Sequence, residues 1–208
     1  MKGRRISILF ASDAHVAAIL RRGPSRIYHV IKWNTDKDTF EHGAWVKARI
    51  YEDVCDVSSD GEYLLYSMFQ GKNLYADYKS FTGLSRLPWL KVLVSWNQVG
   101  TWDGGGRFTE DGRLALNLIM PSIIDTDLKT LQEFEVVYLD KSIRKHYSAY
   151  FKKHKDHGLI PKADWSQKDQ NGRIIWTKGY QIFSHENGLD SLIADFSDLT
   201  PDFQPAPY

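Results

Sequence analysis

Short apolar stretches of strand length alternate with polar turns along the chain. The clearest of these stretches are residues 6–11, 16–20, 27–33 and 45–51. Branched and aromatic side chains dominate them, and such residues favour strands. The segments between them, for example 22–25 and 34–38, carry the Gly, Pro, Asn and Asp residues that are typical of turns. The pattern predicts a protein built mainly from antiparallel strands.

Three polar turns share one motif. Asp60-Gly61, Asp111-Gly112 and Asn171-Gly172 each end a polar segment and are followed at once by an apolar run. Such dipeptides supply the positive backbone angles of a tight hairpin. The repetition predicts a β-propeller-like fold of repeated hairpin units. The glycines are unevenly spaced, 51 and then 60 residues apart, so three unrelated hairpins in one antiparallel sheet stay an open alternative.

One segment departs from the strand pattern. Between residues 142 and 155, Ile143, Tyr147 and Tyr150 recur at helical spacing with charged residues between them. We therefore expect one inserted amphipathic helix in a single mainly-β domain that spans residues 1–208. Residues 189–196 fit either a strand or a short helix.

Composition limits the classes of function. The chain is 42% hydrophobic and 13% aromatic, which suits a protein with a packed core and contact anchors at its surface. A net charge of +1 argues against a general affinity for nucleic acid or membranes. Cys55 is the only cysteine, and it fits a buried, reduced thiol in a cytoplasmic protein. No transmembrane stretch or metal-ligand pattern is present in the sequence, and we expect no cofactor.

Three basic residues surround the first turn. Arg21, Arg22 and Arg26 flank Gly23-Pro24-Ser25 and could bind a carboxylate, a phosphate or an acidic partner protein. A charged loop without a ligand is the alternative.

A second candidate is the glycine-rich segment 99–107. Trp102 could be an exposed anchor beside three consecutive glycines, and Asp103 and Arg107 lie on either side of these glycines. A wide hairpin or a bulge is the alternative.

The expected helix provides a third candidate. Residues 141–157 carry six Lys or Arg against one Asp, and Lys152 and Lys153 lie among them. This basic stripe could hold phosphates or an acidic partner, or it could be a solvated helix face.

Several motifs together resemble an uncharacterised family of bacterial proteins. The motifs are residues 19–25, Trp33-Asn34-Thr35 with Asp38 and Phe40, residues 49–51, Cys55-Asp56 with Asp60-Gly61, residues 104–106 and residues 192–196. The resemblance covers most of the chain and implies one β-rich domain without a known activity.

No catalytic constellation is recognisable in the sequence, whereas aromatic residues and arginines, which are enriched at protein interfaces, are abundant. The leading hypothesis is a non-enzymatic bacterial protein-binding module of immunity or scaffold type. The alternative is an enzyme or binding protein that acts on a phosphorylated or nucleic-acid ligand through basic residues. A third, lesser hypothesis is a protein with a small-molecule or sugar site at Trp102.

Overall fold

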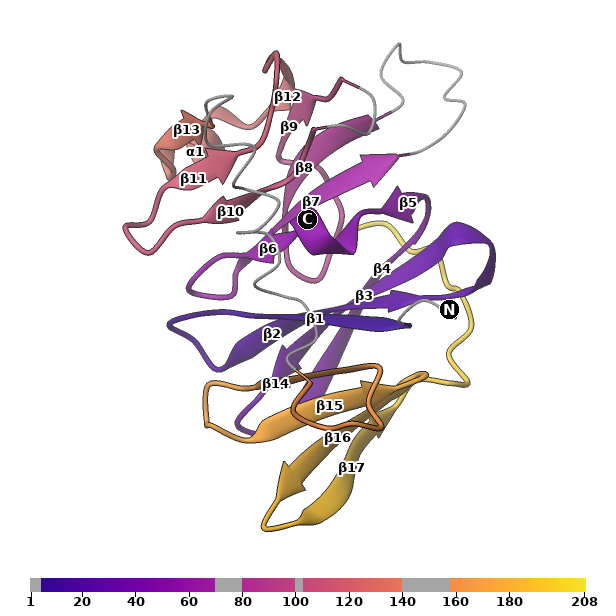
Figure 1. The fold of residues 1–208 in the computed structure, drawn as a ribbon. Coiled ribbons are helices and arrows are strands. Elements are labelled where there is room, and N and C mark those ends of the chain that lie inside the picture. Colours follow the sequence, from indigo (N-terminus) through magenta and orange to yellow (C-terminus); the bar gives the residue numbers. More distant parts are fainter. Residues whose placement is uncertain (1–4, 70–79, 100–102, 140–157) are drawn as a thin grey trace.

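A computed structural model describes residues 5–69, 80–99, 103–139 and 158–208. Within these residues the strands form four sheets, A to D, and nearly all strand pairs are antiparallel (Figure 1). The prediction of a mainly-β, antiparallel protein is confirmed.

Sheets A and D are meanders, in which each strand pairs with the next one along the chain. Sheet A consists of β1 (Ile6–Phe10), β2 (Val16–Arg22), β3 (Ile27–Asn34) and β4 (Thr39–Lys47). Sheet D consists of β14 (Trp165–Lys168), β15 (Ile174–Lys178), β16 (Gln181–Glu186) and β17 (Leu189–Asp195). The segment that fitted either a strand or a helix is thus the strand β17. The single strand expected at 45–51 is wrong: residues 45–47 end β4, which starts in the polar sequence after the turn at 34–38, and Arg49–Ile50 form a separate strand, β5, in another sheet.

Sheets B and C lie between A and D in the sequence. Sheet B has the order β12 (Ile123–Thr126), β9 (Val94–Asn97), β8 (Ser80–Arg86), β7 (Tyr63–Phe69) and β5 (Arg49–Ile50), and β6 (Asp56–Val57) also pairs with β7. Sheet C consists of β10 (Gly106–Phe108), β11 (Leu114–Leu116) and β13 (Val136–Tyr138). The pair β11–β13 is parallel, and the helix α1 (Leu128–Gln132) precedes β13.

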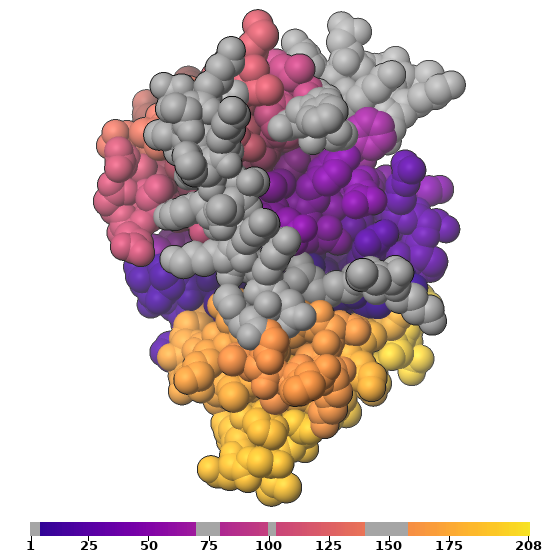
Figure 2. Space-filling model, viewed as in Figure 1, coloured from indigo at the N-terminus to yellow at the C-terminus, as the bar shows by residue number. Residues whose placement is uncertain are grey.

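The finer parts of the fold prediction have different outcomes. Among the described residues no sheet closes on itself and no propeller is present, since sheet A lies between sheet B and sheet D in one stack (Figures 1 and 2). The amphipathic helix expected at 142–155 lies outside the described residues. The described part of the chain contains a single α-helix, α1.

Sheet A is covered on both faces. One face packs on sheet B, where Leu20 and Val30 meet Leu64 and Met68. The other face packs on sheet D in a cluster that contains Ile19, Ile31, Trp33, Trp165, Ile175 and Ile182. Successive side chains of a strand point to opposite faces, so a strand buried on both faces needs an unbroken apolar run. This explains why β2 does not alternate between apolar and polar residues.

The three Gly-containing turns adopt the same hydrogen-bonded structure. In each, a glycine N–H donates to the carbonyl three residues earlier, at 2.9, 2.9 and 3.0 Å for Gly61, Gly112 and Gly172. Their φ angles are 75°, 82° and 80°, which favour glycine. A side-chain oxygen at the first position, from Ser58, Thr109 or Asp169, accepts the N–H four residues later. Each turn joins two antiparallel strands that are consecutive in the chain, β6–β7 in sheet B, β10–β11 in sheet C or β14–β15 in sheet D.

The third turn also fastens sheet D to sheet A. Arg173 donates from Nε to Asp169 at 2.8 Å and from its two terminal nitrogens to both carboxylate oxygens of Asp38, at 2.9 and 3.1 Å. It also donates to the carbonyl of Thr35 at 2.6 Å. These partners raise the pKa of Arg173 above its ordinary value. In the same turn, Gln170 donates to the carbonyls of the β1–β2 turn. The polar contacts therefore set how the two sheets dock.

We expect Arg173→Lys to destabilise the protein by about 1–3 kcal/mol, because an ammonium keeps the charge but cannot make the forked contacts. Urea unfolding measures the change. Arg113→Lys is the matched control, since Arg113 stands at the same position of the second turn and forms its ion pair with the exposed Asp111 of the same turn. An equal loss in both variants would contradict a special role for Arg173.

Candidate functional site

Arg21 is buried and contacts the segment after β17. Its Nε donates to the carbonyl of Phe196 at 2.8 Å, and a terminal nitrogen lies 3.4 Å from the carbonyls of Ser197 and Leu199. The guanidinium also lies 4.4 Å from the centre of the Tyr180 ring. Burial lowers the pKa of Arg21. The structure thus gives this predicted binding residue an internal role, in which it holds residues 196–199.

Arg22 and Arg26, the other two arginines beside residues 23–25, do not form a cluster with Arg21. Arg22 follows Arg21 on β2 and therefore points to the opposite face, near Tyr28. Arg26 is exposed and has a positive φ of 60°. Among the three arginines, Arg26 is the most exposed and Arg22 is partly exposed.

The glycine-rich segment supports neighbouring backbone. Asp103 is buried, and its two carboxylate oxygens accept the N–H groups of Val99 at 2.8 Å and Ile119 at 2.9 Å. Arg107 is also buried. Trp102 lies outside the described residues, as do Lys152 and Lys153.

The glycines themselves are needed for packing. A Cβ on Gly104 would lie 1.2 Å from the side-chain nitrogen of Gln98, and one on Gly105 would lie 2.1 Å from the carbonyl oxygen of Val54. The close approach that we considered for a ligand is therefore made to other parts of the same chain.

A pair of histidines lies at the edge of the contact between sheets A and D. The Nδ1 of His29 is 3.2 Å from the carbonyl oxygen of Ala44, which can only accept, so this nitrogen carries the proton. The Nε2 of His29 then accepts from Nδ1 of His42 at 2.9 Å. His42 is exposed as a residue, but partial burial of its ring lowers the pKa of His42. The ring of Trp45 stacks on His29 at 4.1 Å.

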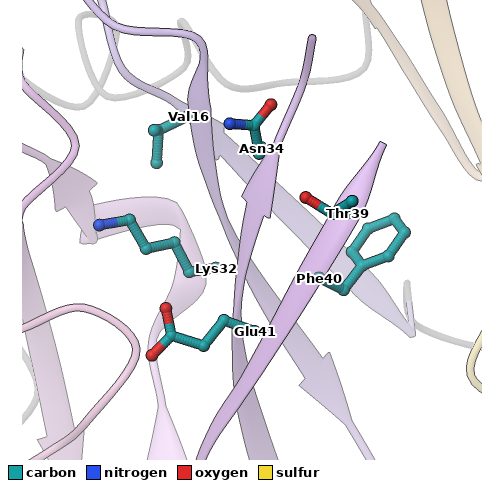
Figure 3. A pocket seen from close by; sticks show the side chains of 6 residues that line it. All are labelled: Val16, Lys32, Asn34, Thr39, Phe40 and Glu41. Carbon is teal, nitrogen blue, oxygen red and sulfur yellow. The ribbon is translucent and has the colours of Figure 1, made fainter. Parts of the chain in front are cut away.

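A hollow of about 260 Å³ opens on sheet A (Figure 3). Val16, Lys32, Asn34, Thr39, Phe40 and Glu41 line it. The ammonium of Lys32 is bound to Glu62, the residue before β7, at 2.8 Å, so the cation of the hollow already has a carboxylate partner. The lining mixes both charges with apolar surface and selects no single class of ligand.

Among the described residues, the longest run of exposed positions surrounds β12. All residues from 119 to 129 are exposed, and five of them are large and apolar. We call this segment the β12 surface; its apolar residues are Ile119, Met120, Ile123, Ile124 and Leu128. Met120 and Leu128 are 70% and 66% exposed. Ile123 and Ile124 follow each other on β12 and point to opposite faces, so apolar side chains are exposed on both sides of this strand. Large apolar side chains that are exposed close together mark contact sites more often than isolated ones do.

The backbone of the β12 surface is held in place. Asp103 binds the N–H of Ile119, Asn97 binds that of Ser122 at 2.6 Å, and the carbonyl of Leu93 accepts the N–H of Asp127 at 2.6 Å. The carboxylate of Asp127 accepts from the N–H of Lys129 and the hydroxyl of Thr130, at the start of α1. These bonds lower the pKa of Asp127. The apolar side chains are thus presented on a fixed frame.

Sequence reasoning missed the β12 surface. The run of apolar residues around Pro121 could have drawn attention to it, but the same composition is typical of a buried strand. Exposure follows from the position of β12 as the last strand of sheet B, at which the described part of the sheet ends.

Metal and membrane sites have no support in the described residues. No group of three or more His, Cys, Asp or Glu side chains there could hold a metal ion. None of the helices in that part of the chain has the length and apolar character needed to span a membrane. Cys55 is buried, as predicted, and burial raises the pKa of its thiol.

Comparisons of the chain with protein-family models, with curated proteins and with solved structures find no match. The resemblance to an uncharacterised bacterial family therefore stays a prediction.

Gly104→Ala should cost about 3 kcal/mol or more, because the new methyl group would displace Gln98 from its bonds to Ser67 and Asp103 and would meet a φ of 114°. Gly172→Ala is the control: its φ is also positive but nothing lies within 4 Å, so we expect a loss of about 1 kcal/mol. Thermal unfolding compares the two, and similar losses would argue against tight packing at Gly104.

Burial lowers the pKa of His29 to about 4, and the nearby His42 and Arg21 add to the effect. The unfolded chain therefore binds more protons than the folded one between about pH 4 and 6.5. Stability from this residue is complete above that window and is lost as the pH falls through it, by roughly 3 kcal/mol at most. Urea unfolding between pH 7 and 4 should show a steeper loss for the wild type than for His29→Gln. Equal slopes would contradict the shifted pKa.

Proposed function

We propose that this protein is a non-enzymatic protein-binding module and that the β12 surface is where its partner binds. The observation that carries the proposal is the run of exposed residues from 119 to 129 with large apolar side chains on a fixed backbone. Water contact with such side chains is unfavourable, and a partner that covers them removes the cost.

Two features define the partner. Among the described residues, β12 is an outer strand of sheet B, so a strand of the partner could pair with its outer edge. The β12–β9 register shifts between Ile123 and Asp125, which bends the edge and limits unspecific pairing. Asp125 and Asp127 supply negative charge beside the apolar residues. A matching partner is a protein with an apolar patch and basic residues at its rim.

The setting of this function is part of the proposal. A bacterial, cytoplasmic protein of immunity or scaffold type fits a module that carries one contact surface and needs no cofactor. The recurring turn in sheets B, C and D supports our further proposal that these three sheets contain repeated hairpin units of one kind. Recognition of a phosphorylated or nucleic-acid ligand would depend on Arg26, Arg22 and residues outside the described part, and it stays a prediction.

Met120→Glu and Leu128→Glu should abolish capture of a stoichiometric partner, because each replaces one of the two most exposed apolar side chains of the β12 surface with a charge. Both side chains are exposed, so stability should change by no more than about 0.5 kcal/mol. The measurement is affinity capture from native lysate followed by mass spectrometry of the bound protein.

Leu189→Glu is the matched control, since Leu189 is 74% exposed on the outer strand of sheet D. This variant should retain the partner. Capture that is unchanged in the Met120 and Leu128 variants, or lost equally in the control, would refute the β12 surface as the binding site.

A further inference from the structure

The last residues of the chain cross three sheets. Residues 196–208 leave sheet D, pass the edge of sheet A and reach sheet B (Figure 1, yellow). Arg21 holds their beginning. At the other end, the hydroxyl of Tyr208 donates to the carbonyl of Arg86 at 3.3 Å, and the ammonium of Lys91 binds the Tyr208 carbonyl and lies 5.3 Å from the centre of its ring.

Between these two attachments the tail borders a hollow of about 240 Å³. One wall is the edge strand β4, with Trp45 and Val46, and a second wall is the loop with Trp89 and Leu90. The tail residues Gln204, Pro205 and Ala206 form the remaining wall. We call the surface formed by β4 and this loop, against which the tail lies, the tail groove.

The chemistry of the tail groove suits an extended segment that contains proline. Proline-rich segments are pre-ordered and lose little entropy on binding, and aromatic-lined grooves recognise them in many peptide-binding domains. Trp45 and Trp89 supply aromatic surface, and Lys91 binds a backbone carbonyl of the occupant.

The tail is held by few contacts. Nearly all of residues 201–208 are exposed, and Ala206 is the one that is partly buried. The tail also leaves part of the groove empty. A hollow of about 240 Å³ remains between the groove and the tail, and the small side chain of Ala206 faces it. A segment held in this way can be exchanged for one that fills the groove better.

We propose that the tail groove binds proline-containing extended segments of a partner protein, and that the chain's own tail occupies it in the free protein. Such a partner segment carries a side chain larger than alanine at the position of Ala206. This site uses β4 and the loop at 89–91 and is separate from the β12 surface, so either proposal can fail without the other.

The test uses the full chain with a loosened tail, Pro205→Gly combined with Tyr208→Ala. The probe is a fluorescent, end-capped peptide with the sequence of residues 200–208, and anisotropy measures its binding. The loosened protein should bind it roughly tenfold more tightly than the wild type, whose attached tail competes at a high effective concentration. A peptide with Leu in place of the alanine should bind more tightly again, by up to about tenfold, because it buries additional methylene groups.

Trp89→Ala in the loosened protein should abolish binding, and Leu189→Ala in the same background should leave it unchanged. A peptide with its prolines replaced by alanine should bind at least several-fold more weakly. If Trp89→Ala lowers the melting temperature, Lys91→Met replaces it as the test variant and should weaken binding.

Absence of peptide binding to the loosened protein would overturn the proposal. Binding that is insensitive to both Trp89 and Lys91 would do so too. If the wild type forms a dimer that the loosened protein does not, the occupant is the tail of a second copy, and the proposal of a different partner is wrong.

Discussion

Sheet A packs against sheet B on one face and against sheet D on the other, and this double burial determines where sheets B and D lie. β2 and β3 must supply apolar side chains to sheet B on one face and to sheet D on the other. Burial of both faces removes far more apolar surface from water than a single contact would, and it sets the order of the stack. The strand order of sheet A makes β4 an edge strand, and both hollows and the tail lie along it.

Apolar burial alone does not set the register between sheets, since such contacts have little direction. Polar contacts at the ends of the strands fix the register between the sheets. Arg173, Gln170 and Asn171 from one turn bind carbonyls and carboxylates of sheet A, while Arg21 binds the segment after β17. Each of these groups is directional and would be costly to leave unpaired when buried. The same turn geometry recurs in sheets B and C, but among the described residues its contacts to another sheet are most extensive in sheet D.

Several residues that look suited to recognition act inside the protein instead. Arg21 holds the tail, and Asp103 holds the backbone at Ile119, where the β12 surface begins. The surfaces proposed for binding therefore depend on these residues without including them. A substitution at Asp103 would weaken partner binding by changing the shape of the β12 surface, and not by removing a direct contact with the partner.

The sequence by itself determined the strand-and-turn pattern and the positive-φ turns at Gly61, Gly112 and Gly172. These features depend on neighbouring residues, because strand periodicity and the freedom of glycine act over a few positions. Tertiary structure decided which face of each strand is buried and whether a charge points inward. Arg21 and Arg22 are adjacent in sequence but point to opposite faces, and the apolar residues around Met120 are exposed because the described part of sheet B ends at β12. Burial depends on which sheet stacks on which face, and that is set by residues far apart in the chain.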